Sequence, residues 1–116
     1  MSAQIIPLSP LRKTKSQFAQ VAFQRNELGQ ILNIYGRMVS HGHWKDYAID
    51  MGRERAVFSV FRRASECPLY QIIKHPALRR KQGQYSVVAP GGLILKRGHD
   101  LGSVLKVFER GRFKTV

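Results

Sequence analysis

Apolar residues alternate with polar ones in several stretches of this chain, and in two other stretches they recur every three or four positions. Alternation is typical of β-strands with one buried face, whereas the longer spacing places apolar side chains along one side of an α-helix. The order of these stretches predicts a helix, three strands, a basic loop, two more strands and a final helix.

The strongest strand signal lies at residues 55–63, which mix β-branched and aromatic residues and contain neither glycine nor proline. Phe58 and Val60 fall on one face of this strand, and Val57 and Phe61 fall on the other. Because both faces carry large apolar side chains, we place the strand centrally in a sheet.

Two neighbouring stretches predict the strands that extend this sheet. Residues 44–51 alternate as a half-buried strand, and the short turn at 52–54 joins them to the central strand as an antiparallel hairpin. Residues 69–74 predict a third strand, which Pro76 ends because proline cannot donate to the ladder.

The clearest hairpin joins residues 85–89 to residues 93–96 through Pro90, Gly91 and Gly92. The glycines supply the positive φ that a tight connection needs. The pattern does not determine the strand order.

Two apolar stripes predict the helices. The first helix follows Asn26, its expected N-cap, and ends before Gly42. The second follows Asp100 and stops at Gly111. The expected stripes consist of Leu28, Ile31, Leu32, Tyr35, Met38 and Val39 in the first helix, and of Leu101, Val104, Leu105 and Phe108 in the second.

These elements predict a single α+β domain. An antiparallel sheet of about five strands, a three-strand meander plus a hairpin, would carry an N-terminal and a C-terminal helix on it. The domain is expected at residues 23–111, between a flexible basic arm at 1–22 and a tail at 112–116. The arm either pairs with phosphates or is a solvated terminus without a role.

The net charge is the most informative feature of the composition. Twenty Lys and Arg face seven Asp and Glu, a net charge of +13 in 116 residues. Such an excess favours polyanions such as nucleic acid, and it equally suits an acidic protein partner.

The single cysteine, Cys67, excludes an internal disulfide framework and fits a reducing cytoplasm. Neither a signal peptide nor a long apolar run is present, so we expect a cytoplasmic protein without a membrane span.

The best functional signal is the basic loop from Lys74 and His75 to Lys81. It carries four cations in eight positions and is followed by Tyr85. Such a loop would hold phosphates while an aromatic side chain stacks on a base. It equally fits a solvated loop, and Tyr85 equally fits the core. The expected phosphate contacts are Arg79, Arg80, Lys81, Lys96 and Arg97, with Arg62 and Arg63 secondary.

Candidate chemistry is sparse. His41 and His43 form an H-x-H pair, but nothing in the spacing brings further ligands to them, so we expect no metal site. Asp46 and Asp50 stand roughly 13 Å apart on an extended strand, too far for a carboxylate dyad. We identify no nucleotide-binding loop and no catalytic motif, and therefore expect neither a catalytic residue nor a cofactor.

Four stretches together resemble a family of short alphaproteobacterial proteins that carries only a domain-of-unknown-function label. They are residues 44–50 (WKDYAID), 55–64 (RAVFSVFRRA), 85–88 (YSVV) and 95–101 (LKRGHDL). The likeness spans about residues 25–110. It implies a small bacterial cytoplasmic protein, and it carries no activity or site residues.

The sequence thus predicts a small basic non-enzymatic module that associates with nucleic acid, RNA or a ribonucleoprotein more than DNA, through phosphate contacts. The alternative is an adaptor or regulator whose basic face docks an acidic protein. The oligomeric state is left open.

Overall fold

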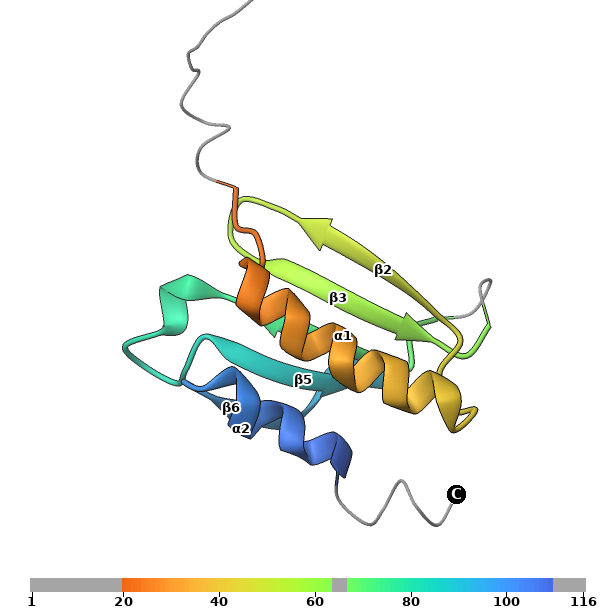
Figure 1. The fold of residues 1–116 in the computed structure, drawn as a ribbon. Coiled ribbons are helices and arrows are strands. Elements are labelled where there is room, and N and C mark those ends of the chain that lie inside the picture. Colours follow the sequence, from red (N-terminus) through yellow and green to blue (C-terminus); the bar gives the residue numbers. More distant parts are fainter. Residues whose placement is uncertain (1–19, 64–66, 110–116) are drawn as a thin grey trace, which may run out of the picture.

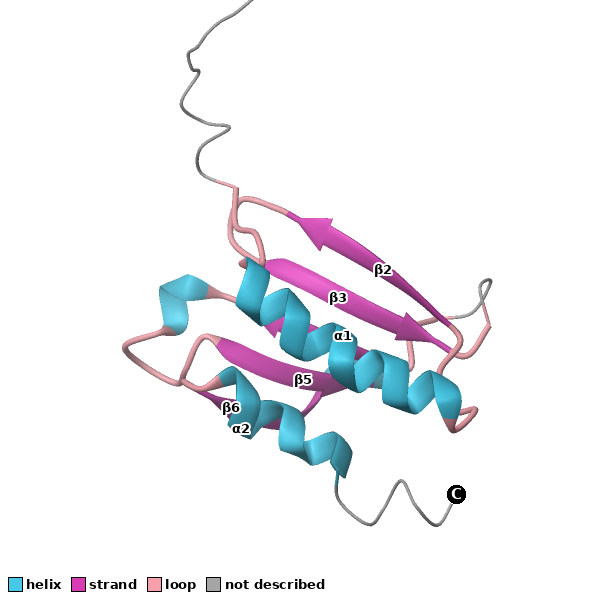
Figure 2. Cartoon of the chain, viewed as in Figure 1, coloured by secondary structure: helices cyan, strands magenta, loops and turns pink. Residues whose placement is uncertain are grey.

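The computed structural model describes residues 20–63 and 67–109 of the chain. Five strands form one antiparallel sheet in the order β2-β3-β4-β5-β6, so each strand pairs with the next along the chain. Helices α1 and α2 lie on the same face of this sheet (Figures 1 and 2). The elements are α1 (Arg25–Ser40), β2 (Asp46–Met51), β3 (Ala56–Phe61), β4 (Tyr70–Lys74), η2 (Pro76–Leu78), β5 (Tyr85–Ala89), η3 (Pro90–Gly92), β6 (Leu93–Gly98), α2 (Leu101–Leu105) and η4 (Lys106–Glu109).

This architecture confirms the predicted single α+β domain with about five antiparallel strands and a helix from each end. The predicted meander and hairpin join directly, because β4 pairs with β5 through four residue pairs. The strand β3 is interior, as its two apolar faces predict, with β2 on one side and β4 on the other.

The core lies between the sheet and the two helices. Phe58, Val60, Ile72 and Val87 are fully buried there, and Val104 of α2 closes the layer. Burying an aliphatic or aromatic side chain of this size stabilises a fold by roughly 1.5–3 kcal/mol. These side chains alternate along their strands, so the residues between them face away from the helices.

The first helix differs from its prediction at its start and in its buried face. It begins at Arg25 with Gln24 as N-cap, in place of Asn26, because Glu27 accepts the Gln24 backbone N–H at 2.6 Å in a capping box. Its buried apolar residues are Ile31, Ile34 and Met38. Leu32 and Val39, both in the predicted stripe, are exposed.

The predicted turn glycines and the predicted N-cap of the last helix are confirmed. The helix itself is shorter than predicted, because α2 ends at Leu105 and continues as the 3-10 helix η4, and the expected stop at Gly111 lies outside the described residues. Gly91 and Gly92 have φ of 83° and 84°, in the left-handed region that glycine tolerates. The Asp100 carboxylate accepts the N–H of Ser103 at 2.9 Å and caps α2.

Most of the expected N-terminal arm and all of the expected C-terminal tail lie outside the described residues. Of the arm, Val21 donates its N–H to the carbonyl of Gly52, and Ala22 accepts a hydrogen bond from Lys74. None of the helices in the described part of the chain is long and apolar enough to cross a bilayer.

Candidate nucleic-acid interface

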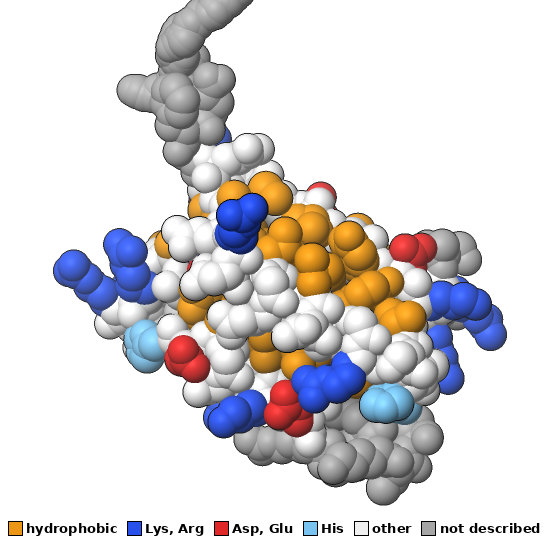
Figure 3. All heavy atoms as spheres, viewed as in Figure 1, with side chains coloured by type: hydrophobic (Ala, Val, Ile, Leu, Met, Phe, Trp, Pro, Cys, Tyr) orange, Lys and Arg blue, Asp and Glu red, His pale blue; other side chains and the backbone are white. Residues whose placement is uncertain are grey.

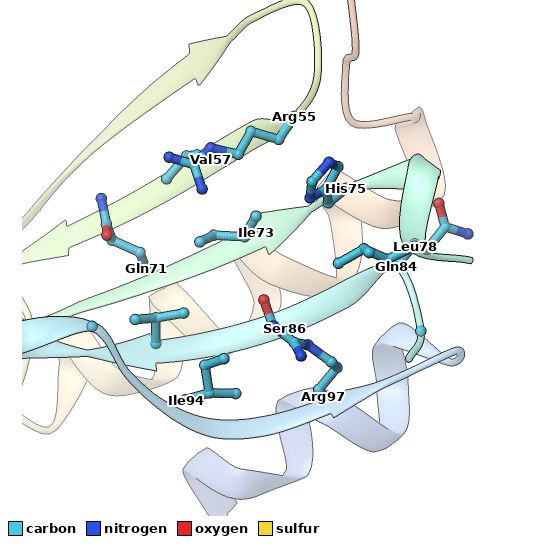
Figure 4. A pocket seen from close by; sticks show the side chains of 13 residues that line it. Arg55, Val57, Gln71, Ile73, His75, Leu78, Gln84, Ser86, Ile94 and Arg97 are labelled. Atoms are coloured by element: carbon cyan, nitrogen blue, oxygen red, sulfur yellow. The ribbon is translucent and has the colours of Figure 1, made fainter. Parts of the chain in front are cut away.

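Within residues 20–63 and 67–109, no α-helix covers the second face of the sheet. Val57 and Ser59 on β3 point to this face, as do Gln71 and Ile73 on β4, because they alternate with the core residues of the same strands. The close-up shows Val57, Gln71 and Ile73 on the side of the sheet turned away from both helices (Figure 4). This open face is where a ligand can reach the sheet directly.

A hollow of about 340 Å³ lies in the open face. Its floor is apolar, and its rim carries hydrogen-bonding and cationic groups. The described residues that line it are Arg55, Val57, Gln71, Ile73, His75, Leu78, Gly83, Gln84, Ser86, Val88, Gly92, Ile94 and Arg97. None of them is acidic, so the hollow is electropositive and suits an anion with an apolar portion.

Two arginines reach into the hollow from different strands. Arg55 precedes β3 and extends over Val57, whereas Arg97 extends from β6 beside Ser86 (Figure 4). One terminal nitrogen of Arg97 donates to the side-chain oxygen of Gln82. Its Nε is buried, and within the described chain no acceptor reaches it. A buried donor without an acceptor costs about 1–3 kcal/mol, which an anionic ligand would offset.

The loop at the end of the hollow has a fixed backbone. The carbonyl of Leu78 accepts the N–H groups of Lys81, Gln82 and Gly83 at 2.9–3.1 Å. The side chains of Arg79 and Arg80, like that of Lys81, are exposed. This loop therefore presents three cations beside the hollow without a large ordering cost on binding.

Acidic residues occupy a separate strip of the same face. Asp46 and Asp50 lie on β2, where they pair with Phe61 and Val57 of β3. Their charge repels an anion from that edge. The attractive part of the open face consequently runs from Arg55 and Val57 at the start of β3 across β4, β5 and β6.

The structure divides the seven predicted phosphate contacts into three groups. Arg97 lines the hollow, and residues 79–81 lie beside it in the loop after η2. Lys96 pairs with the buried Val87, so it lies on the helix-covered face. Arg62 and Arg63 follow the far end of β3, roughly 20 Å from its start by strand geometry.

Two further residues line the hollow: Arg55, which sequence reasoning missed, and His75, which it placed in the basic loop without naming it as a contact. Lys74 of the same loop is instead buried on the helix side, paired with Glu27. Alternation could have identified Arg55. It lies two positions before Val57 on the same strand, and therefore on the face opposite to the core residues. Tyr85, considered for base stacking, is buried beneath the helices and belongs to the core.

The Tyr85 hydroxyl donates to the buried carboxylate of Glu27. Lys74 donates to the same carboxylate at 2.9 Å and to the carbonyl of Ala22 at 2.9 Å. Burial alone would raise the pKa of Glu27, but the hydrogen bonds from Lys74, Tyr85 and the Gln24 N–H, with the charge of Lys74, lower it. Burial first, and then the bond to Glu27, raises the pKa of Tyr85. This cluster holds α1 onto β4 and β5 and does not face the hollow.

The lowered pKa of Glu27 predicts a loss of stability in acid. Its ionised form stabilises the fold above the ordinary value of 4.5, and this contribution disappears as the pH falls through the lower folded-state value. We expect the urea midpoint of the wild type to exceed that of Glu27→Gln at pH 7, and the difference to shrink below pH 4.5. A difference that stays constant down to pH 3 would contradict this assignment.

The histidine pair lies at the end of α1. The rings of His41 and His43 lie 6.3 Å apart, centroid to centroid, after the end of α1. Among residues 20–63 and 67–109, no three His, Cys, Asp or Glu side chains are grouped to hold an ion.

Comparison with known proteins identifies a family and no function. A protein family described as a protein of unknown function (DUF2794) matches residues 21–105 of the chain. No curated protein and no solved structure matches this chain.

Proposed function

Since the chain belongs to that family of unknown function, we propose its role from its geometry: a small non-enzymatic module that binds single-stranded nucleic acid, RNA in particular, on the open face of the sheet. The observation that carries the proposal is the hollow, where Arg55, Arg97 and His75 surround an apolar floor without any described acid. We also propose that the protein is bacterial, from an alphaproteobacterium, and works in the cytoplasm, where RNA and ribonucleoproteins are abundant.

A nucleotide has the two parts that this hollow suits. Its phosphate would pair with the guanidinium groups of Arg55 and Arg97, whose planar donors match phosphate oxygens. Its base would lie on the floor of Val57, Ile73 and Val88, close to the polar side chains of the rim. Residues 79–81 would continue the track of phosphate contacts beyond the hollow.

The form of the surface favours a single strand over a duplex. Sheet-based RNA-binding modules lay unstacked bases on an open face, which a paired base cannot reach. Within the described chain the open face carries one aromatic residue, Phe61, at the end of β3, so base stacking contributes little at the hollow. We therefore expect weak sequence preference and affinity dominated by phosphate contacts.

Adjacent residues of β6 provide the test. Arg97 and Lys96 lie on opposite faces of the sheet, so Arg97→Gln and Lys96→Gln remove the same charge from different surfaces. We expect Arg97→Gln to weaken binding of a fluorescent single-stranded RNA by about ten- to a hundredfold, since a hydrogen bond to a charged group contributes about 1.5–3 kcal/mol. Lys96→Gln should change it by much less.

A salt series with the same RNA gives the second readout. Each lost phosphate contact should reduce the slope of log affinity against log salt by about 0.7 for a single strand. Equal effects of the two substitutions on affinity and slope would mean that total charge, and not the open face, holds the RNA. Binding that ignores salt would contradict phosphate contacts altogether, and a discrete acidic protein that co-purifies after nuclease treatment would support the adaptor instead.

A further inference from the structure

The strand β2 forms one edge of the sheet and lies beyond the cover of α1 (Figure 1). Apolar side chains gather between α1 and β2 on the helix side of the molecule (Figure 3). Four of them, Leu32, Val39, Tyr47 and Met51, are 38–43% exposed. An exposed apolar strip beside an unpaired strand edge is typical of an interaction surface.

The two edges of the sheet differ. The β6 edge carries a bulge opposite Val87 and Val88 and two consecutive cations, features that discourage strand addition. The strand β2 pairs with β3 through six consecutive residue pairs without a bulge, and it contains no proline and no cation. No other strand of the described residues pairs with its outer side, which is therefore a regular template for another strand.

We propose that β2 pairs with β2 of a second copy of this chain, antiparallel, about a two-fold axis at Ile49. The backbone of β2 permits this register. The N–H of Gly52, just after β2, donates to the carbonyl of Arg55, just before β3. In an antiparallel pair this alternates, so the even-numbered residues of β2 direct their N–H and C=O groups toward β3. Tyr47, Ile49 and Met51 then turn theirs to the free edge.

Two hydrogen bonds of β2 agree with this alternation. The N–H of Tyr47 donates to the Asp46 side chain at 3.0 Å, and the carbonyl of Met51 accepts the Gln20 amide at 3.1 Å. These are the groups that would pair with each other across the axis. The side chains of Asp46 and Gln20 would release them on association.

The side chains select Ile49 as the centre. Tyr47 then faces Met51 of the second copy, Ile49 faces its own equivalent, and Asp50 faces Ala48, so no acid opposes an acid directly. A centre at Tyr47 would place Ile49 opposite Lys45, and a centre at Met51 would place it opposite Arg53. Leu32 and Val39 of both α1 helices would flank the resulting apolar strip.

A cysteine at the axis tests both the association and its register. Directly opposed residues of a hydrogen-bonded antiparallel pair have Cα atoms about 5.5 Å apart, a spacing that a disulfide spans. The exposed Cys67 is first replaced, giving Cys67→Ser as background. In that background Ile49→Cys should form a covalent dimer under mild oxidation. Leu93→Cys, more exposed and on the β6 edge, should not cross-link, although its non-covalent association through β2 is unchanged.

Sedimentation of the nuclease-treated wild type completes the test. We expect twice the chain mass of 13.3 kDa, with association strengthened by salt because two copies of charge +13 repel each other. Met51→Glu should shift the protein toward monomer, and Leu93→Glu should not. A wild type that stays monomeric at about 100 µM in high salt, or equal cross-linking of the two cysteine variants, would overturn the proposal.

Discussion

Lys74→Met is expected to destabilise the fold by about 3–5 kcal/mol, the usual cost of removing one partner of a buried ion pair. Lys74 and Glu27 are both buried, and their charged atoms lie 2.9 Å apart. Without the Lys74 ammonium group, the Glu27 carboxylate would remain buried between α1 and the sheet. Its remaining hydrogen-bond donors would be the Tyr85 hydroxyl and the Gln24 N–H. Urea unfolding at pH 7 measures the loss.

The double variant Glu27→Leu/Lys74→Met is the control. Removing both charges together leaves no unpaired ion, so we expect it to recover most of the stability that Lys74→Met loses. A Lys74→Met variant as stable as the wild type would show that the pair does not hold α1 to the sheet. Equal losses in the single and double variants would show that the lysine acts through packing.

Gly83→Ala is expected to destabilise the protein by about 3 kcal/mol or more, from two sources that each contribute about 1–3 kcal/mol. The residue has φ of 102°, which an L side chain rarely adopts. A Cβ at this position would also lie 2.7 Å from the Cα of Gly98 and closer still to its carbonyl group. Thermal and urea unfolding measure the change.

Gly98→Ala serves as the matched comparison. Its Cβ would meet only the side chain of Val104, at 3.4 Å, so a small shift accommodates it. Because Gly83 lines the hollow, its replacement should also weaken RNA binding beyond the effect of lost stability. Similar stabilities for the two alanine variants would contradict the close approach of the loop to β6.

The strands were predictable because alternation is a local property. The buried face of α1 was not predictable, because it depends on a distant contact. Lys74, which pairs with the buried Glu27, lies 47 positions away along the chain. An acid in the first turn of a helix looks like an ordinary N-terminal charge. This ion pair, the capping box and the packing of Ile34 turn α1 so that Leu32 and Val39 remain exposed.

The candidate site was predictable in composition but not in arrangement. The sequence locates the cations of the loop and of β6, yet charge alone does not assign Lys96 and Arg97 to opposite faces. Alternation separates these two neighbours, but which of them shares the face of the hollow depends on their pairing with β5, where Arg97 faces Ser86 and Lys96 faces the buried Val87. Arg55 joins the site only because β3 and β4 place it across from His75, a relation between distant parts of the chain.

The most direct test of the central claim is an amide chemical-shift titration of the protein with a short single-stranded RNA. The account predicts that the largest shifts fall on the open face and its loop, at Gln71, His75, Arg97 and residues 79–83, whereas α1 and α2 change little. Shifts confined to the helices or to β2, or no shifts at low salt, would contradict it.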